Sequence, residues 1–370
     1  MRSAVEQTRT VLEEVLTVTV TGGTEGPTTT GTRSGSRPGS GSGAGAAAKV
    51  GDEASGGAED PGTAGTGTGA GADARDGADP GSGDGGGASA DAVPEALAEF
   101  LAFARRRLTG EYEVDEFGFD RELTERVLIA ALRPLYRAWF RVEVSGIENV
   151  PDDGAALVVA NHSGAIALDA LMTQVAVFDE HPKHRHLRPL GADLVFRAPV
   201  VGELARKSGA TLATNADAER LLAGGSVVGV WPEGFKGVGK PFSERYKLQR
   251  FGRGGFVSAA MRTRAPIVPC SIVGAEETYP IIGNMPATAR LLGLPYLPVT
   301  PTWPWLGPLG LVPLPSKWLI EFSPPVHTEE YGEKAAEDPM LVFELADQVR
   351  RTIQQTLYAL LMRRSSVFGR

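Results

Sequence analysis

A histidine and an aspartate placed seven residues apart are the pair in this sequence best suited to chemistry. His162 follows Ala155–Ala160, an apolar run with the length and composition of a buried strand. Asp169 opens a segment with helical spacing of apolar residues, and we expect it to be the N-cap of that helix. Because a carboxylate fixes the tautomer of a histidine and stabilises its charged form, the pair is typical of a general base. The simpler interpretation is a histidine that only caps a backbone group.

A second strand end carries polar residues of a complementary kind. The apolar run Val227–Val230 leads into Trp231–Gly237, which contains an acid, a cation and two glycines. Open α/β sheets place their sites at the carboxyl ends of strands, so the two strand ends could supply a single site.

These stretches resemble the glycerolipid acyltransferase family, the lysophosphatidate acyltransferases and their relatives. Asn161-His162 matches the family's N-H-x-x-x-x-D block, Trp231–Gly237 matches its F-P-E-G-T-R-S block, and Ala265–Pro269 matches its later I-V-P strand. The order and rough spacing agree over about residues 140–325. The resemblance implies fatty acyl transfer, with the first block catalytic and the second binding the acceptor.

The chain departs from the family pattern at three places. Ala167 stands where the family has its Asp, so Asp169 can serve only if Ser163–Leu168 forms a loop, since a straight helix would separate the pair by about 10 Å. Lys236 replaces an Arg, which exchanges a bidentate fork for a point charge. The run Gly209–Asn215 offers only hydroxyls and an amide where the family often has a cation. Recognition of a phosphate on the acceptor is therefore open.

The resemblance and the residues together predict a mechanism without a cofactor. We expect His162 to take the proton from an acceptor hydroxyl that attacks the thioester of acyl-CoA or acyl-carrier protein, while Asp169 orients the ring. A backbone N–H near Gly164 or Gly234 would stabilise the oxyanion. The acceptor is expected to be a lysophospholipid or glycerolipid. The predicted acceptor-binding residues are Glu233, Gly234 and Lys236.

A basic stretch after the second block is the strongest charge feature in the predicted folded part. Together with Lys236 of that block it has six cations against a single acid, Glu244. It is interpreted as a docking site for the phosphates of acyl-CoA, for acyl-carrier protein or for an acidic lipid headgroup, with a solvated basic surface as an equal alternative. The predicted donor- or phosphate-binding residues are Lys240, Arg245, Lys247, Arg250 and Arg253.

Two other functions fit the same residues, whereas metal chemistry does not. A lipid- or acyl-carrier-binding module would bind without turnover, and an esterase would use water in place of the acceptor alcohol. No metal site is expected, because His181–His186 has no Cys, Asp or Glu at ligand spacing and its cations would repel a metal. Cys270 lies in an apolar run and is expected to be a core residue.

Composition divides the chain into a tail and one domain. Residues 21–92 hold 23 of the 47 glycines and no aromatic residue, so residues 1–92 are predicted to be disordered. The remainder is close to neutral, and no nucleic-acid partner is expected. Residues 93–370 are predicted to form a single α/β acyltransferase-like domain with a mostly parallel central sheet flanked by helices. Its parts are amphipathic helices at 93–140, a catalytic core at 141–325 and a closing helix at 340–364.

The uncharged stretch Leu291–Ser316 is the main candidate for contact with a membrane surface. Its seven prolines argue against a spanning helix, while Trp303 and Trp305 are of a type enriched at bilayer interfaces. The stretch could reach the headgroups, wall an acyl channel or lie buried on the domain. Arg105–Arg107 could also touch headgroups, although ordinary packing is favoured. The predicted location is the cytoplasmic face of a membrane, as a peripheral protein, or the cytoplasm.

Overall fold

The computed structural model describes residues 92–252 and 254–369. The predicted tail at residues 1–92 falls almost entirely outside these residues, as does Arg253. The chain divides into two compact units, and the larger contains residues 106–370. The smaller unit comprises residues 23–105. Of these the structure describes residues 92–105, which lie in helix α2 (Ala92–Thr109).

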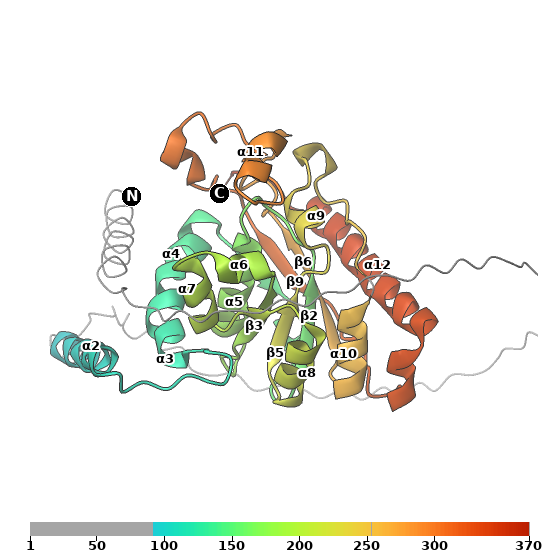
Figure 1. The fold of residues 1–370 in the computed structure, drawn as a ribbon, viewed down its shortest axis with the longest axis horizontal. Helices are drawn as coiled ribbons and strands as arrows, with labels where there is room; N and C mark the ends of the chain where they lie inside the picture. The colour runs from blue at the N-terminus through green and yellow to red at the C-terminus, as the bar shows by residue number, and fades with distance from the viewer. Residues whose placement is uncertain (1–91, 253, 370) are drawn as a thin grey trace, which may run out of the picture. The chain divides into compact units, whose positions relative to one another are not determined.

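A seven-stranded sheet organises the larger unit (Figure 1). All neighbouring strands pair in parallel except β6 and β9, which are antiparallel. The prediction of an α/β domain with a mostly parallel central sheet is therefore confirmed. The strands in spatial order are β1 (Glu143–Ser145), β9 (Leu319–Phe322), β6 (Ile267–Val273), β2 (Ala156–Ala160), β5 (Val227–Val230), β3 (Leu187–Gly191) and β4 (Thr211–Leu212).

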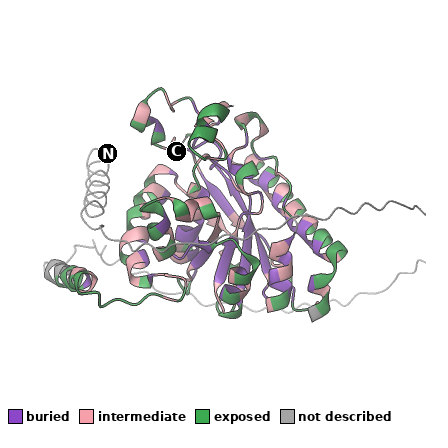
Figure 2. Ribbon diagram, in the orientation of Figure 1, coloured by how far each residue is buried: buried purple, intermediate pink, exposed green. Residues whose placement is uncertain are grey.

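The two central strands are buried on both faces, which explains their unbroken apolar sequences. Every residue of β2 and of β6 is buried (Figure 2). Parallel strands covered by helices on both sides have no solvent-facing row, so apolar residues occupy successive positions. Cys270 lies inside β6 with no exposed surface, and burial raises the pKa of its thiol.

Alternate residues of β2 enter two separate cores, as the pleat of a strand requires. Leu157 and Val159 pack in the core that includes α8 (Asn215–Ala223), α10 (Gly255–Thr263) and α12 (Pro339–Arg363). Ala156 and Val158 pack in the other core with helix α5 (Leu168–Glu180). Figure 1 shows α8, α10 and α12 together on one side of the sheet.

Within 93–140, where amphipathic helices were predicted, a helical run spans Arg121–Trp139 and begins at a capped end. The side chain of Asp120 accepts a hydrogen bond from the Leu123 N–H, as an N-cap does. Asp120 also pairs with Arg107 at 2.7 Å, so this arginine is engaged in packing. The run is made of α3 (Arg121–Leu123), a π-helical turn η1 (Thr124–Ile129), α4 (Ala130–Pro134) and a second π-helical turn η2 (Leu135–Trp139).

Short elements surround the ends of the strands. None of the described helices is long and apolar enough to cross a bilayer. The remaining helical elements are η3 (Ile147–Asn149), α6 (Asp193–Arg197), α7 (Val201–Lys207), α9 (Phe235–Val238), η4 (Phe242–Glu244), α11 (Pro286–Leu291), η5 (Gly307–Leu311) and η6 (Glu333–Glu337). A small antiparallel ribbon pairs β7 (Gly283–Asn284) with β8 (Pro298–Val299).

Candidate active site

The end of β2 is locked to its neighbour by a side-chain amide. The Asn161 Oδ1 accepts from the Ile272 N–H at 2.7 Å, and its Nδ2 donates to the Ile272 carbonyl at 3.0 Å. Asn161 is 1% exposed and so satisfies both backbone groups away from water. This clamp fixes the point at which the next residue, His162, leaves the sheet.

The structure brings His162 and Asp169 into contact. The His162 Nδ1 lies 2.7 Å from the Asp169 Oδ2, and that oxygen also accepts from the Ser163 N–H at 2.9 Å. Because an ionised carboxylate only accepts, Nδ1 carries the proton and the Nε2 lone pair is left free. Asp169 is fully buried, whereas the His162 side chain is 15% exposed. The ring is thus open to a substrate and its partner is not.

The segment between the two residues is a loop, as the pairing requires. Residues 163–167 are not helical, and Gly164 has a φ of +86° that favours glycine. The expectation that Asp169 is an N-cap is wrong, because α5 already begins at Leu168 with Ala167 at the cap position. The carboxylate turns back toward the loop and binds His162.

Glu233 holds the backbone of His162 from the second block. Its Oε1 accepts from the His162 N–H at 2.9 Å, and its Oε2 accepts from the Gln249 N–H at 2.6 Å. Glu233 is 4% exposed, and burial raises the pKa of its carboxyl against the opposing effect of the Lys240 cation. Both oxygens bind loop backbone, so the contacts of Glu233 are those of a positioning residue rather than of the predicted acceptor ligand.

The second block packs directly against the histidine. A Cβ on Gly237 would lie 2.7 Å from the His162 carbonyl oxygen, so only glycine allows this approach. The N–H of Gly234, a predicted acceptor-binding residue, donates to the Trp231 carbonyl at 3.0 Å and is therefore not available to an oxyanion. Lys236 is exposed on α9 and remains free to meet an acceptor.

Two buried polar atoms beside the histidine have unused hydrogen-bonding capacity. The Trp231 ring centroid lies 6.0 Å from that of His162, and its Nε1 has no partner within the described residues. The Ser163 Oγ is likewise buried and unpartnered there. Both positions could bond a polar substrate group.

The sequence comparisons identify the family of this site. Residues 141–273 match the acyltransferase family model. An uncharacterized protein of Mycobacterium tuberculosis is 59% identical over 282 residues, which cover 75% of this chain and 79% of that protein. The chain belongs to the acyltransferase family. This confirms the resemblance and makes the protein an acyltransferase.

More distant relatives of this acyltransferase carry lipid-related names. A human protein named DGAT1/2-independent enzyme synthesizing storage lipids is 27% identical over 146 residues, or 40% of this chain and 44% of that protein. The crystal structure of the 1-acyl-sn-glycerophosphate acyltransferase PlsC from Thermotoga maritima is similar at a TM-score of 0.43 and 19% identity, covering 67% of this chain and 85% of that one. That likeness is too distant to carry an argument about the fold or the substrate.

Lys240, predicted to bind the donor in this acyltransferase, is paired inside the protein. The Lys240 Nζ lies 3.0 Å from the Glu276 Oε1 and donates to the Lys247 carbonyl at 3.1 Å, with 2% of the side chain exposed. Its prediction as a phosphate ligand is wrong, because a buried and paired ammonium cannot reach an incoming anion. Arg245, Lys247 and Arg250 are exposed and remain candidates.

The sequence analysis missed three residues that build the site of the acyltransferase. Asn161 was noticed only as part of a motif, and Gln249 supplies a backbone N–H that no sequence pattern marks. Glu276 could have been found, because an acid between the apolar β6 and the uncharged run that follows indicates a buried carboxylate needing a cation.

We call His162 and Asp169 the dyad and residues Ser163–Ala167 between them the dyad loop; an apolar cavity of about 300 Å³ lies beside this loop. Ala165 and Ile166 of that loop line it, as does Phe235 next to Lys236. The rest of the wall comes from Leu194 of α6, from Tyr279 and from nine residues between 294 and 311: Leu294, Pro295, Tyr296, Leu297, Pro298, Thr300, Trp303, Gly310 and Leu311. The uncharged stretch thus walls a cavity at the site.

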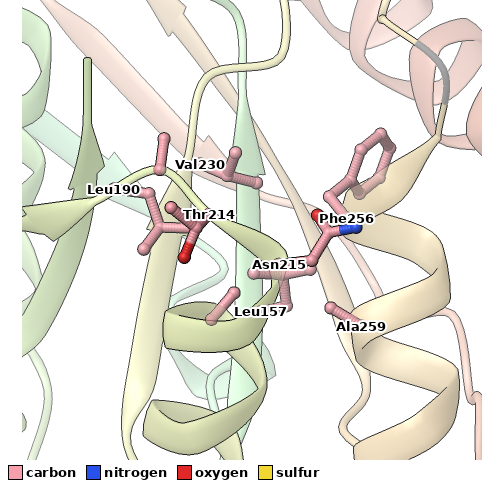
Figure 3. A pocket seen from close by; sticks show the side chains of 9 residues that line it. Leu157, Leu190, Thr214, Asn215, Val230, Phe256 and Ala259 are labelled. Carbon is pink, nitrogen blue, oxygen red and sulfur yellow. The ribbon is translucent and has the colours of Figure 1, made fainter. Parts of the chain in front are cut away.

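A second, smaller cavity does not contact the dyad. It has a volume of about 80 Å³ and lies between α8 and α10, where Leu190, Val230 and Phe256 face Thr214 and Asn215 (Figure 3). None of its lining residues is titratable. We assign the chemistry to the larger cavity.

Proposed function

We propose that this acyltransferase moves a fatty acyl group from acyl-CoA or acyl-carrier protein to a hydroxyl of a lysophospholipid or glycerolipid. The observation that carries the proposal is the contact of 2.7 Å between His162 and Asp169 next to an apolar cavity of about 300 Å³. A base and an apolar cavity are what a hydroxyl and a fatty chain need in order to react.

The reaction proceeds by direct transfer between the two substrates. The acceptor oxygen attacks the thioester carbon while its proton passes to the free His162 Nε2. Asp169 balances the imidazolium charge. The tetrahedral intermediate then collapses, the C–S bond breaks, and the imidazolium returns the proton to the leaving thiolate. The products are an ester and a free thiol, and the histidine is regenerated.

The oxyanion of that intermediate needs a hydrogen-bond donor near the ring. The N–H of Gly164 bonds no acceptor within residues 92–252 and 254–369, and this glycine lies in the dyad loop beside Ser163. A free backbone N–H aimed at the developing charge is worth roughly 10²-fold to 10³-fold in kcat. Gly164 is therefore the proposed oxyanion donor.

The two substrates divide between the apolar and the charged parts of the site. The fatty chain lies in the cavity, where apolar burial supplies binding free energy. Lys236 holds the polar end of the acceptor, and the exposed Arg245, Lys247 and Arg250 receive the anionic part of the donor. An acceptor without a phosphate is supported by the lack of a cation in 209–215, and the name of the human relative refers to the synthesis of storage lipids.

The test is an assay of the purified full chain with palmitoyl-CoA and a panel of lysolipids and alcohols. Thiol release and ester formation are measured together. His162→Ala is expected to lose roughly 10²-fold to 10⁴-fold in turnover. The matched control is His327→Ala, since the His327 Nδ1 also lies 2.7 Å from a carboxylate oxygen, of Glu329, but at an exposed position.

The same assay separates the proposed function from its two alternatives. An esterase would release free fatty acid and thiol whether or not an acceptor is present. A binding module would copurify with lipid and show no thiol release with any acceptor. Full turnover by His162→Ala would remove the mechanism even if ester is formed.

A further inference from the structure

The uncharged stretch presents an unusual density of large exposed apolar side chains. Leu291 is 85% exposed, and Trp305 and Leu309 are each 70% exposed. Isolated exposed apolar residues are ordinary, whereas a large group of them marks an interaction surface, and here they are gathered in one stretch of the chain. We define the apolar face as the exposed large residues of this stretch, namely Leu291, Leu292, Trp305, Leu306, Leu309, Leu311 and Val312.

The stretch that carries the apolar face is held to the dyad loop and to the cavity wall by hydrogen bonds. The Tyr296 hydroxyl donates to the Ala165 carbonyl of the dyad loop at 3.0 Å. The Tyr279 hydroxyl donates to the Leu311 carbonyl at 2.6 Å. The stretch Leu291–Ser316 is therefore fixed over the cavity on one side and carries the apolar face on its exposed side. Ile166 and Phe235, which line the cavity, are themselves 47% and 44% exposed. Leu311 belongs both to the apolar face and to the cavity wall, so the face reaches the cavity.

The exposed charged residues that adjoin Leu291 of the apolar face and Phe235 of the cavity along the chain are cations. Between Thr278 and Ser316 the only charged residue is Arg290, which is exposed at the end of α11 directly before Leu291. On the cavity side, Lys236 is exposed next to Phe235. An apolar surface bordered by cations is complementary to lipid chains below anionic headgroups.

We propose that the apolar face docks on a lipid surface and turns the mouth of the cavity toward it. Lipid substrates then enter the cavity without crossing water. A second copy of the chain fits less well, because a two-fold interface would bring the face with its cations against itself and close the cavity. The reason for docking rests on the proposed function, but the docking itself is measured without turnover.

The experiment compares flotation of the full chain with vesicles of phosphatidylcholine alone and of phosphatidylcholine mixed with phosphatidylglycerol. The test variant combines Leu291→Ser, Trp305→Ser and Leu309→Ser, none of which lines the cavity. The control combines Met340→Ser, Tyr358→Ser and Met362→Ser, which are comparably exposed on α12. Turnover of a water-soluble short-chain acyl thioester and light scattering are recorded for each protein.

The wild type and the control are expected to float, more strongly on the anionic vesicles. The test variant should lose roughly 10²-fold in partition coefficient, from about fivefold for each apolar side chain withdrawn from lipid. Its turnover of the soluble substrate should equal that of the wild type. If no protein turns over but the flotation pattern holds, the docking stands and the proposed function fails.

Three results would overturn the docking. The wild type could fail to float on either vesicle, or the test variant could float as well as the wild type. The third result is a wild-type dimer that the test variant converts to a monomer without any flotation, which would assign the apolar face to a second copy of the chain.

Discussion

Replacing Asp169 by asparagine tests the geometry of the dyad with the smallest change in shape. The Asp169 Oδ2 accepts from both the His162 ring and the Ser163 N–H, while Oδ1 accepts from the Ala170 N–H at 2.9 Å. An asparagine has one acceptor and one donor end. Whichever way it turns, its NH₂ group faces at least one N–H that the carboxylate accepted from.

The orientation of that asparagine decides the size of the loss. If its NH₂ faces the ring, Nδ1 must accept, and the proton moves to Nε2, which can then no longer act as a base. A wrong tautomer of this kind lowers kcat by up to about 10⁴-fold. If its oxygen faces the ring, the tautomer is kept but the imidazolium loses its counter-charge. We therefore expect kcat to fall roughly 10²-fold to 10⁴-fold, with KM little changed.

The measurement is the initial rate of thiol release with an acceptor, with kcat and KM separated. Asp179→Asn is the matched control, because Asp179 lies in the same helix with its side chain 4% exposed but pairs with Arg133 at 2.7 Å. That variant should keep its kcat even if its melting temperature falls. If Asp169→Asn is folded and keeps kcat within about threefold of the wild type, Asp169 does not set the tautomer of a catalytic base.

Three further predictions address the buried carboxylates around the site. Glu233→Gln places an NH₂ group against the N–H of His162 or Gln249, so it should lower the unfolding free energy by about 1–3 kcal/mol and lower kcat rather than raise KM. A change in KM alone would show that Glu233 binds the acceptor. Lys240→Met should lower the unfolding free energy, measured by chemical denaturation, by about 3–5 kcal/mol at about pH 8, and adding Glu276→Gln should restore most of that loss. Losses that simply add in the double variant would contradict a buried ion pair. Burial raises the pKa of the Glu276 carboxyl to about 7, above its unfolded value, so its stabilising contribution is present below about pH 4.5 and is lost as pH rises to about 7. Glu276→Gln should therefore flatten the slope of the unfolding free energy against pH in this range. An unchanged slope would refute the assignment.

The apolar runs of the sequence were sufficient to predict a mostly parallel sheet and its strands β2 and β5. The strands at Ala156–Ala160 and Val227–Val230 were expected within a residue of their observed bounds, because fully buried parallel strands are continuous apolar segments. The loop before α5 was also anticipated, since Asp169 could reach His162 in no other way. These features depend on local sequence and on the length of a turn.

The roles of the charged residues could not be read in the same way. Lys240 belongs to a basic stretch, and its burial is set by Glu276, which approaches only when β6 is placed in the sheet. Glu233 is of a residue type that often binds substrates, but its carboxylate accepts from backbone N–H groups of two loops. Whether a charge binds a substrate or the protein itself depends on long-range packing, which the residue types do not encode.

The loop from Ser163 to Ala167 links two properties that many enzymes keep apart. It sets the distance between base and acid, and through Ala165 and Ile166 it also forms part of the cavity wall. A chain that pushes on Ile166 pushes on the segment that aligns the imidazole. Under the proposed function, selectivity for chain shape and speed of transfer are therefore mechanically coupled, and we expect that reshaping this wall for a different fatty acid alters the rate as well.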